Sequence, residues 1–191
     1  MSYLISVVVL TYNSNFEDLK KTILSIIKQK NISFEIIVAD DGSNKDYFDK
    51  IKEIFEEHSF VHYQLIKSEK NCGTCQNFYN ALEKAKGEYV KPISPQDFLY
   101  DANTLCAWYN FMKINNIQVS FGNAIYYMKK DNFMHVFQKS STQPTHKKLY
   151  ELNNNYYYRV LIDNLVLNDC VLGATYLCNK DILKKYLKND N

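Results

Sequence analysis

Three short polar clusters, far apart in the sequence, carry side chains that could hydrogen-bond a ligand. Thr11-Tyr12-Asn13 offers a hydroxyl, an aromatic ring and an amide, and Asp40-Asp41-Gly42-Ser43 offers two carboxylates beside a turn. Ser94-Pro95-Gln96-Asp97 adds a further carboxylate. Hydroxyls and amides both donate and accept hydrogen bonds, whereas ionised carboxylates only accept them. The same residue types also form simple polar turns, so the segments that position the clusters decide between a ligand site and a turn.

Each cluster directly follows a short apolar run that is typical of a buried strand. The three runs are Leu4 to Leu10, Phe34 to Ala39 and Tyr89 to Ile93, and Val61 to Lys67 predicts one more strand. Apolar residues at helical spacing lie between them, in Leu19 to Ile27, Tyr47 to Phe55 and Phe78 to Ala85. This alternation predicts an α/β fold of the Rossmann type, with a mostly parallel sheet flanked by helices. Ligands of such sheets bind beyond the carboxyl ends of the strands, where all three clusters would meet.

Local signals predict where several helices begin and end. Ser14 to Glu17 has the spacing of a capping box, and Gly87 is expected at the C′ position of the third helix. Asp101 is the expected N-cap of a helix over residues 102–115. The apolar side chains that this helix should turn inward are Leu105, Trp108, Phe111 and Met112.

The pattern changes beyond residue 118 to a small region of mixed strands. Its expected elements are strands from Val119 to Tyr127 and Phe133 to Gln138, a helix from Tyr156 to Leu167, a strand from Thr175 to Asn179 and a helix from Ile182 to Leu187. No segment is rich enough in glycine or proline to mark a linker. We therefore expect residues 1–191 to form a single domain.

Composition and charge exclude several classes of protein. The chain has 191 residues, of which 46% are hydrophobic and 23% charged, values that are typical of a globular domain. The net charge of +2 is too small to indicate a nucleic-acid partner, and Arg159 is the only arginine, so a phosphate group would have to be bound by lysine, backbone amides or a metal. Without a long apolar run or a leader segment, the expected location is the cytoplasm, with no transmembrane segment.

The five cysteines are expected to be reduced thiols, because their number is odd and no export signal precedes them. Cys72 and Cys75 have the C-x-x-C spacing near a predicted helix start, where backbone N–H groups would stabilise a thiolate. A redox pair is therefore an alternative for this segment. It is disfavoured because nothing around it resembles a thioredoxin.

Taken together, these segments resemble the nucleotide-sugar-binding half of family 2 glycosyltransferases with the GT-A fold. The resemblance lies in ISVVVLTYNS from Ile5, FEIIVADDGS from Phe34, NCGT from Asn71 and AKGEYV from Ala85. It covers about residues 3 to 101, with the motifs in the order and spacing of the family. It implies that residues 1–101 bind the donor and that residues 102–191 form the acceptor side.

The resemblance implies a donor site for a nucleoside diphosphate sugar, with a UDP-sugar favoured. The residues that match the family's donor-binding segments are Thr11, Tyr12, Asn13, Asp40, Asp41, Asn71, Gly73, Asn77, Ser94 and Gln96. At Asp40 and Asp41 the alternative is a turn stabilised by Gly42. Gln76 stands where the family commonly has an arginine, so phosphate binding would depend more on the helix N-terminus.

A departure from the family lies at Ser94-Pro95-Gln96-Asp97. Relatives usually place an aspartate-any-aspartate motif here, followed by another aspartate, to hold Mg²⁺ or Mn²⁺ against the diphosphate. Ser94 and Gln96 replace the two motif carboxylates, and Asp97 alone is expected to contact the metal. One carboxylate with diphosphate oxygens and waters can complete the coordination of such a cation.

The implied reaction is inverting transfer of the sugar to a carbohydrate or lipid-linked acceptor hydroxyl, in bacterial surface polysaccharide or lipooligosaccharide synthesis. Peripheral contact with a membrane is left open. One alternative is a non-catalytic nucleotide-sugar-binding module with a degenerate metal motif. Another is a sugar-phosphate nucleotidyltransferase, which is disfavoured because residues 11–14 are not a glycine-rich phosphate loop.

The catalytic base of the family usually lies in an acidic segment after the acceptor-side strands. Residues 173–187 resemble the strand and helix that precede that segment, so the base is expected beyond Asn191. The chain is then expected to be a truncated, donor-binding part that transfers sugar inefficiently. If it transfers sugar efficiently alone, Asp163 or Asp169 would be the candidate base.

Overall fold

The computed structural model describes residues 3–130, 133–137, 144–150, 160, 162, 165–166 and 169–187. Residues 1–120 together with 177–191 form one compact unit, and residues 121–176 form another. The strand-end clusters all lie in the first unit. The assignment of residues 1–101 and 102–191 to donor and acceptor halves stays a prediction.

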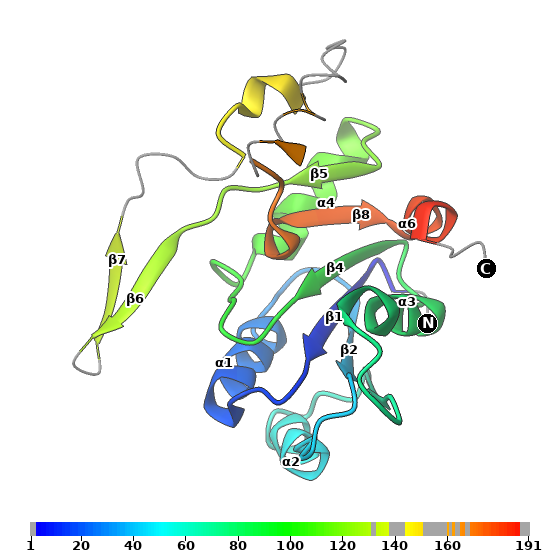
Figure 1. The fold of residues 1–191 in the computed structure, drawn as a ribbon, viewed down its shortest axis with the longest axis vertical. Coiled ribbons are helices and arrows are strands. Elements are labelled where there is room, and N and C mark those ends of the chain that lie inside the picture. Colours follow the sequence, from blue (N-terminus) through cyan, green and yellow to red (C-terminus); the bar gives the residue numbers. More distant parts are fainter. Residues whose placement is uncertain are drawn as a thin grey trace. The chain divides into compact units, whose positions relative to one another are not determined.

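A six-stranded sheet organises the first unit (Figure 1). Its strands are β1 (Ile5–Thr11), β2 (Phe34–Asp40), β3 (Tyr63–Lys67), β4 (Tyr89–Ile93), β5 (Val119–Phe121) and β8 (Tyr176–Asn179). Their order is β3-β2-β1-β4-β8-β5; β1 to β4 pair in parallel, whereas β8 runs antiparallel to β4. The predicted α/β fold with a mostly parallel sheet is therefore confirmed.

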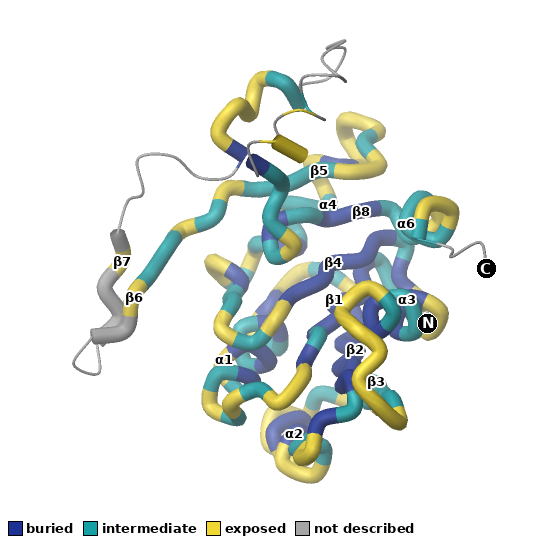
Figure 2. The backbone as a smooth tube through the Cα atoms, viewed as in Figure 1, coloured by how far each residue is buried: buried dark blue, intermediate teal, exposed yellow. Residues whose placement is uncertain are grey.

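Helices cover both faces of this sheet and bury two apolar clusters against it. Figure 2 shows the central strands as buried. The helices are α1 (Phe16–Ile27), α2 (Phe48–Glu57), α3 (Thr74–Lys84), α4 (Thr104–Ile114) and α6 (Lys180–Leu187). Alternate residues of β1 serve different clusters: Val7 packs with α1, α2 and α4, whereas Val8 packs with α3. Burial on both faces explains why β1 is an almost unbroken apolar run instead of an alternating one.

Two predicted helix caps are wrong by one or two residues. The N-cap of α1 is Asn15 and not Ser14, because the Asn15 side chain accepts hydrogen bonds from the backbone N–H groups of Glu17 and Asp18. The N-cap of α4 is Asn103 and not Asp101, whose carboxylate instead accepts hydrogen bonds from the backbone N–H of Asn103 and the hydroxyl of Thr104. In both cases neighbouring polar residues can fill the same role, so the sequence places the cap only to within one or two residues.

Gly87 serves a different purpose from the expected helix cap. Helix α3 ends at Lys84, and its C-cap Ala85 is extended. A Cβ atom at Gly87 would lie 2.4 Å from the backbone nitrogen of Ser6. Glycine is required here because the chain passes directly against the start of β1.

The inward face of α4 is narrower than the sequence predicts. Leu105 and Met112 are buried, as expected, and Trp108 packs at the edge of the core. Phe111 is half exposed, so its predicted inward position is wrong. Met112 takes the buried position beside it, because a helix turns only part of its circumference toward a sheet.

The second unit contains a β-hairpin and two short 3₁₀ turns. Strands β6 (Tyr126–Lys130) and β7 (Phe133–Phe137) pair antiparallel, and the turns are η1 (Lys147–Tyr150) and η2 (Gly173–Thr175). The strand predicted from Val119 to Tyr127 is thus two strands, β5 and β6, with residues 122–125 between them. Most of the helix predicted from Tyr156 to Leu167 lies outside the described residues.

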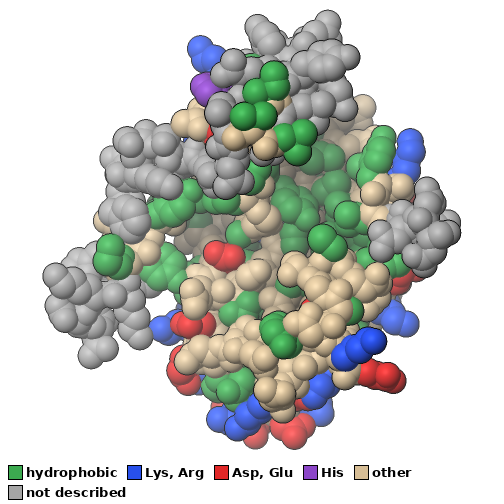
Figure 3. Space-filling view, viewed as in Figure 1, with side chains coloured by type: hydrophobic (Ala, Val, Ile, Leu, Met, Phe, Trp, Pro, Cys, Tyr) green, Lys and Arg blue, Asp and Glu red, His purple; other side chains and the backbone are tan. Residues whose placement is uncertain are grey.

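Charged side chains are concentrated around α2 on the face shown in Figure 3, where both signs lie side by side. This distribution matches the amphipathic pattern of α2, whose Ile51, Ile54 and Phe55 are buried. Among the described residues, no helix is long and apolar enough to cross a bilayer.

Candidate donor-binding site

The register of the sheet brings the first two polar clusters together. Thr11 lies opposite Asp40 at the carboxyl ends of β1 and β2, and the backbone N–H of Asp41 donates to the carbonyl of Thr11 at 2.9 Å. The Thr11 hydroxyl is buried and donates to Ser14 Oγ at 2.8 Å, whereas Tyr12 is half exposed. The accessible ring of Tyr12 therefore follows directly after Thr11, which is held in place at the end of β1.

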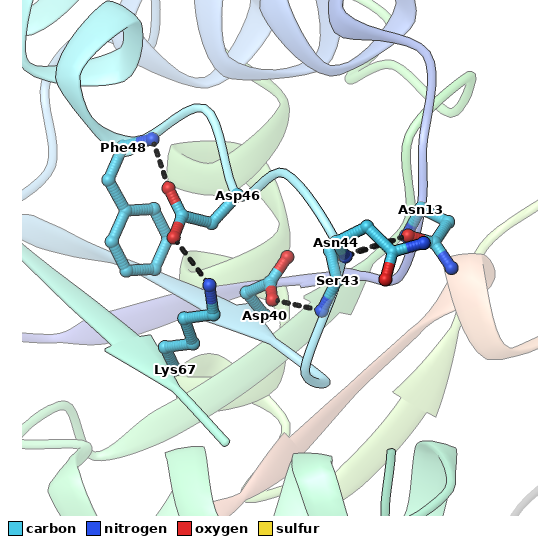
Figure 4. Close-up of polar contacts among 7 residues, drawn as sticks. All are labelled: Asn13, Asp40, Ser43, Asn44, Asp46, Phe48 and Lys67. Carbon is cyan, nitrogen blue, oxygen red and sulfur yellow. Dashed lines mark hydrogen bonds and ion pairs between the residues drawn. The ribbon is translucent and has the colours of Figure 1, made fainter. Parts of the chain in front are cut away.

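Asn13 ties the loop after β1 to the loop after β2 (Figure 4). Its backbone N–H donates to Ser43 Oγ at 2.7 Å, and its Oδ1 accepts from the backbone N–H of Asn44 at 3.1 Å. Asn13 has a φ of 46°, a left-handed conformation that asparagine tolerates better than most residues. The position thus needs the asparagine for local structure as well as for any contact with a ligand.

Asp40 forms the turn that was the alternative to a ligand contact. Its side chain is buried, and Oδ1 accepts from the backbone N–H of Ser43 at 2.7 Å (Figure 4). The nearby Lys67, at the end of β3, instead pairs with Asp46 at 2.8 Å, and this hydrogen bond lowers the pKa of Asp46. Asp40 therefore shapes the loop that carries Asp41.

Asp41 binds the loop before α3 through both of its carboxylate oxygens. Oδ1 accepts from the backbone N–H of Cys72 at 2.9 Å and from its thiol at 2.8 Å, and Oδ2 accepts from the backbone N–H of Gly73 at 3.0 Å. The hydrogen bond to this carboxylate raises the pKa of the Cys72 thiol. Cys72 is thus held as a thiol, which argues against the alternative of a redox pair at Cys72 and Cys75.

Two glycines allow these loops to meet. Gly42 has a φ of 76°, and a Cβ atom there would lie 2.6 Å from the carbonyl carbon of Lys70. Gly73 has a φ of 88° with open space where a Cβ atom would lie, and its N–H also donates to Asn71 Oδ1 at 3.0 Å. Gly42 is therefore needed for close approach, and Gly73 is needed for backbone conformation.

Replacing Asp41 with Asn should loosen this connection. An amide has one acceptor oxygen, so its NH₂ group would face one of the two backbone N–H groups that the carboxylate binds. We expect the free energy of unfolding to fall by about 1 kcal/mol, the typical net contribution of one hydrogen bond. Urea unfolding would measure the change, with Asp49→Asn on the exposed side of α2 as the control. An unchanged stability would contradict the assignment of both carboxylate oxygens.

Asn77 lies beneath the predicted site instead of at its surface. It is 2% exposed, and its Nδ2 donates to the carbonyl of Ala39 at 3.0 Å. Within the described residues its Oδ1 has no hydrogen-bond partner. The side chain joins α3 to the end of β2, which makes it a support for the site.

The third cluster forms a tight turn after β4. The backbone N–H of Asp97 donates to the carbonyl of Ser94 at 3.1 Å, and Gln96 has a φ of 82°. Ser94 and Gln96 are exposed, whereas Asp97 is partly buried. Burial raises the pKa of Asp97, and the neighbouring Lys91 acts in the opposite sense.

Lys91 is a buried residue of this site that sequence analysis missed. It is 1% exposed within β4, its Nζ donates to the carbonyl of Pro92, and it lies 5.8 Å from the centre of the Trp108 ring. Burial lowers its pKa to about 7. The sequence feature that could have identified this residue is a lysine inside an otherwise uncharged strand, Tyr89–Ile93.

The described residues can hold a divalent cation only if a bound ligand supplies further coordinating atoms. Among the described side chains, no group of three or more His, Cys, Asp or Glu is placed to hold a metal ion. Asp97 is a single, partly exposed carboxylate at the carboxyl end of β4. Magnesium in nucleotide sites is commonly held by one or two carboxylates together with phosphates and waters, so Asp97 can hold a cation jointly with a bound diphosphate.

Of the two candidate bases within the chain, the structure describes Asp169. Its carboxylate accepts from the backbone N–H of Thr145 at 2.7 and 2.9 Å and lies 3.6 Å from the imidazole of His146. Burial raises its pKa, but the hydrogen bonds from Thr145 outweigh this and hold the pKa below the usual value. The Asp169 carboxylate thus has a structural role, because it binds the backbone at Thr145. Asp163 lies outside the described residues.

Comparison with proteins of known sequence shows similarity to bacterial glycosyltransferases. The chain is 27% identical over 121 residues to the Escherichia coli UDP-Glc:alpha-D-GlcNAc-diphosphoundecaprenol beta-1,3-glucosyltransferase WfgD, a match that covers 63% of this chain and 46% of that protein. It is 29% identical over 121 residues to the poly(ribitol-phosphate) beta-glucosyltransferase of Bacillus spizizenii, covering 62% of this chain and 18% of that protein. The chain therefore spans less than half the length of these relatives.

Solved structures share the fold. S. aureus TarS 1-349, whose structure is also known in complex with UDP, has a TM-score of 0.61 at 23% identity and covers 95% of this chain and 48% of its own. Mannosyltransferase PcManGT from Pyrobaculum calidifontis, in complex with GDP-Man and Mn²⁺, has a TM-score of 0.64 at 15% identity and covers 97% of this chain and 47% of its own. The sequence profile of glycosyl transferase family 2 matches residues 6–187. With nearly the whole chain matched, the protein belongs to glycosyl transferase family 2.

Proposed function

We propose that the protein binds a nucleoside diphosphate sugar, with UDP as the nucleotide, and transfers the sugar to an acceptor hydroxyl with inversion. The observation that carries the proposal is the joining of the loops after β1 and β2 to the start of α3 through Asp41. This arrangement fixes polar side chains and a helix N-terminus at the carboxyl edge of a parallel sheet, where nucleotides bind in such folds. Family membership supports it.

The donor and acceptor are proposed from the relatives. The name of the E. coli relative gives UDP-Glc as donor and a diphosphoundecaprenol-linked sugar as acceptor, and TarS has been solved with UDP-GlcNAc. A lipid-linked or other carbohydrate acceptor in bacterial surface polysaccharide synthesis is therefore the proposed setting.

In the proposed reaction the acceptor oxygen attacks the anomeric carbon from the face opposite the diphosphate. The bond to the acceptor oxygen forms as the bond to the diphosphate oxygen breaks, and a carboxylate base takes the hydroxyl proton. Thr11, Tyr12 and Asn13 would orient the nucleotide, and Asp97 would hold Mg²⁺ or Mn²⁺ with the diphosphate. The cation supplies positive charge that neutralises the leaving group.

A non-catalytic nucleotide-sugar-binding module is the second candidate, favoured by one observation. Ser94 and Gln96, in the turn after β4, have no carboxylate. A metal bound there would have fewer charged ligands than in a site with two motif aspartates. Such a module would bind the donor but would not release UDP upon addition of any acceptor.

Donor binding should stabilise the protein against unfolding. At a donor concentration about 100 times Kd, the expected gain is about 2.7 kcal/mol, or several degrees in Tm. UDP-Glc, UDP-GlcNAc, GDP-Man and the free nucleotides should be compared with and without Mn²⁺. UDP compounds should give the largest shifts, and absence of a shift with every nucleotide would overturn the proposal.

Asp97→Asn tests the metal within the same assay. The variant should retain its fold and lose the part of the donor affinity that depends on Mn²⁺, because an amide is a weaker cation ligand than a carboxylate. Asp49→Asn, which removes a carboxylate on α2, should keep the Mn²⁺ dependence of the wild type. If the donor affinity of Asp97→Asn depended on Mn²⁺ as strongly as that of the wild type, Asp97 would have only a structural role in the turn.

A further inference from the structure

Gln96 occupies a strained position at the proposed donor site. Its φ of 82° lies at the third position of the four-residue turn from Ser94 to Asp97, which is closed by the Asp97 N–H to Ser94 carbonyl bond. Turns with a positive φ at this position strongly favour glycine or asparagine, because a longer side chain crowds the backbone. A glutamine is thus kept here against the local conformational preference. Strain of this kind is commonly found at functional sites.

Helix α1 holds this turn at two points, although 75 or more residues separate the partners in sequence. Asp18 Oδ2 accepts from Gln96 Nε2 at 3.2 Å. The hydroxyl of Thr22 is shared between the carbonyls of Asp97, at 3.0 Å, and Asp18, at 3.1 Å. Asp18 and Thr22 are four residues apart and therefore lie on one face of α1. The turn is thus fixed by the side chain of Gln96 and by the backbone of Asp97.

Asp18 is itself well placed for such a role. It lies in the first turn of α1, where the N-cap Asn15 accepts from its backbone N–H. A rigid helix end positions a side chain more accurately than a loop does. Asp18 also accounts for an amide at position 96, because a carboxylate there would lie against the Asp18 carboxylate and repel it.

We propose that Asp18 is a positioning residue of the donor site, which holds the exposed Gln96 amide in the conformation that contacts a hydroxyl group of the sugar nucleotide. The inference rests on the proposed donor site and adds a residue outside the motifs that resemble the family. The strained glutamine is retained for this contact, and the hydrogen bond to Asp18 fixes its side chain. A glycine at position 96 would suit the backbone better but would lose the contact.

Four variants separate positioning from a general effect on helix α1. Asp18→Ala removes the acceptor, and Asp18→Asn keeps an acceptor oxygen for Gln96 while removing the charge. Glu17→Ala is the matched control, because Glu17 is the other acidic residue in the first turn of α1 and its backbone N–H is capped by the same Asn15 side chain. Gln96→Gly relieves the backbone and removes the side chain.

The measurements are the Kd of UDP-Glc in the presence of Mn²⁺ by calorimetry and the Tm of each variant. Asp18→Ala should weaken binding about tenfold, in line with the loss of the hydrogen bond that holds the Gln96 side chain. Asp18→Asn and Glu17→Ala should stay within about twofold of the wild type. Gln96→Gly should weaken binding by a similar factor to Asp18→Ala while leaving Tm unchanged or higher.

The outcomes separate this inference from the proposed function. If the wild type binds no sugar nucleotide, the proposed function fails. If the wild type binds but Asp18→Ala and Gln96→Gly bind equally well, Asp18 and Gln96 only shape the turn, and the inference is overturned. It is also overturned if Asp18→Asn is as weak as Asp18→Ala, because the charge of Asp18 would then act on the ligand directly.

Discussion

Replacement of Lys91 by Met is expected to abolish a rise in folding stability that the wild-type protein shows between about pH 7 and pH 10. Burial lowers the pKa of Lys91 to about 7 in the folded protein, with Asp97 acting in the opposite sense. The unfolded chain keeps the ordinary lysine pKa of about 10.4. Between these values the unfolded state binds more protons, so the free energy of unfolding rises by about 1.4 kcal/mol per pH unit. The free energy of unfolding is thus about 4 kcal/mol higher at pH 10 than at pH 7, and this gain is absent below the pKa of Lys91 in the folded protein.

Urea unfolding at pH 7, 8 and 9 would measure this effect as the difference between Lys91→Met and the wild type. The variant should be more stable by an amount that shrinks as the pH rises, because the wild type gains what the variant cannot. Lys113→Met is the control: Lys113 is exposed on α4, and its hydrogen bond to Glu88 raises its pKa. Its pH dependence should stay parallel to that of the wild type over this range.

Trp108 offers a second readout of the same titration. It is the only tryptophan, and its ring lies 5.8 Å from the Lys91 Nζ. Its fluorescence in the folded wild type should change around pH 7 and should lose that change in Lys91→Met. Parallel stability profiles for Lys91→Met and the wild type would show that Lys91 titrates as an ordinary lysine.

Replacement of Glu35 by Ala should destabilise the protein by about 3–4 kcal/mol, since it removes a buried carboxylate that satisfies several donors. Glu35 is 2% exposed. Oε1 accepts from Ser6 Oγ at 2.7 Å and from the backbone N–H of Lys86 at 2.6 Å, and Oε2 accepts from Gln64 Nε2 at 3.0 Å. These bonds join β1, β2 and β3 to the segment that follows α3.

Matched variants would show that the loss comes from this network. Glu35→Gln keeps the shape and one acceptor oxygen and should cost about half as much. Glu53→Ala, on the exposed side of α2, should stay within about 0.5 kcal/mol of the wild type. Donor affinity should not change in any of them, because Glu35 lies at the amino ends of the strands. A loss below about 1 kcal/mol in Glu35→Ala would contradict the structural role.

Much of the fold could be predicted because its signals are local. The unbroken apolar run at β1 and the helical spacing in α1 and α2 gave the alternation of strands and helices, and right-handed crossovers then left a parallel sheet. Boundaries were less accurate where neighbours compete, as at Ser14 and Asn15. The strand predicted from Val119 to Tyr127 was wrong in length, because residues 122–125 lie between β5 and β6 and belong to neither strand.

The predicted site residues fall into groups that the sequence could not distinguish. Tyr12, Ser94 and Gln96 are accessible, whereas Asp41 and Asn77 are buried. Asp41 binds the loop before α3, and Asn77 binds the end of β2. A carboxylate at a strand end can contact a ligand or cap a neighbouring loop, and its residue type is the same in both cases. Whether the accessible residues bind the donor stays a prediction.

The sequence by itself determined which residues lie at strand ends, because periodicity and turn residues are properties of neighbouring positions. It also determined the family, through motifs whose order and spacing can be read along the chain. The tertiary structure alone decided that Asp41 binds Cys72 and Gly73, that Asp18 holds Gln96, and that Lys91 loses its water. The first two features depend on contacts between residues 31 or more positions apart, and the third depends on the burial of the Lys91 side chain in the folded protein. Contact and burial set the energies of charged and polar groups, and both arise only when the helices close over the sheet.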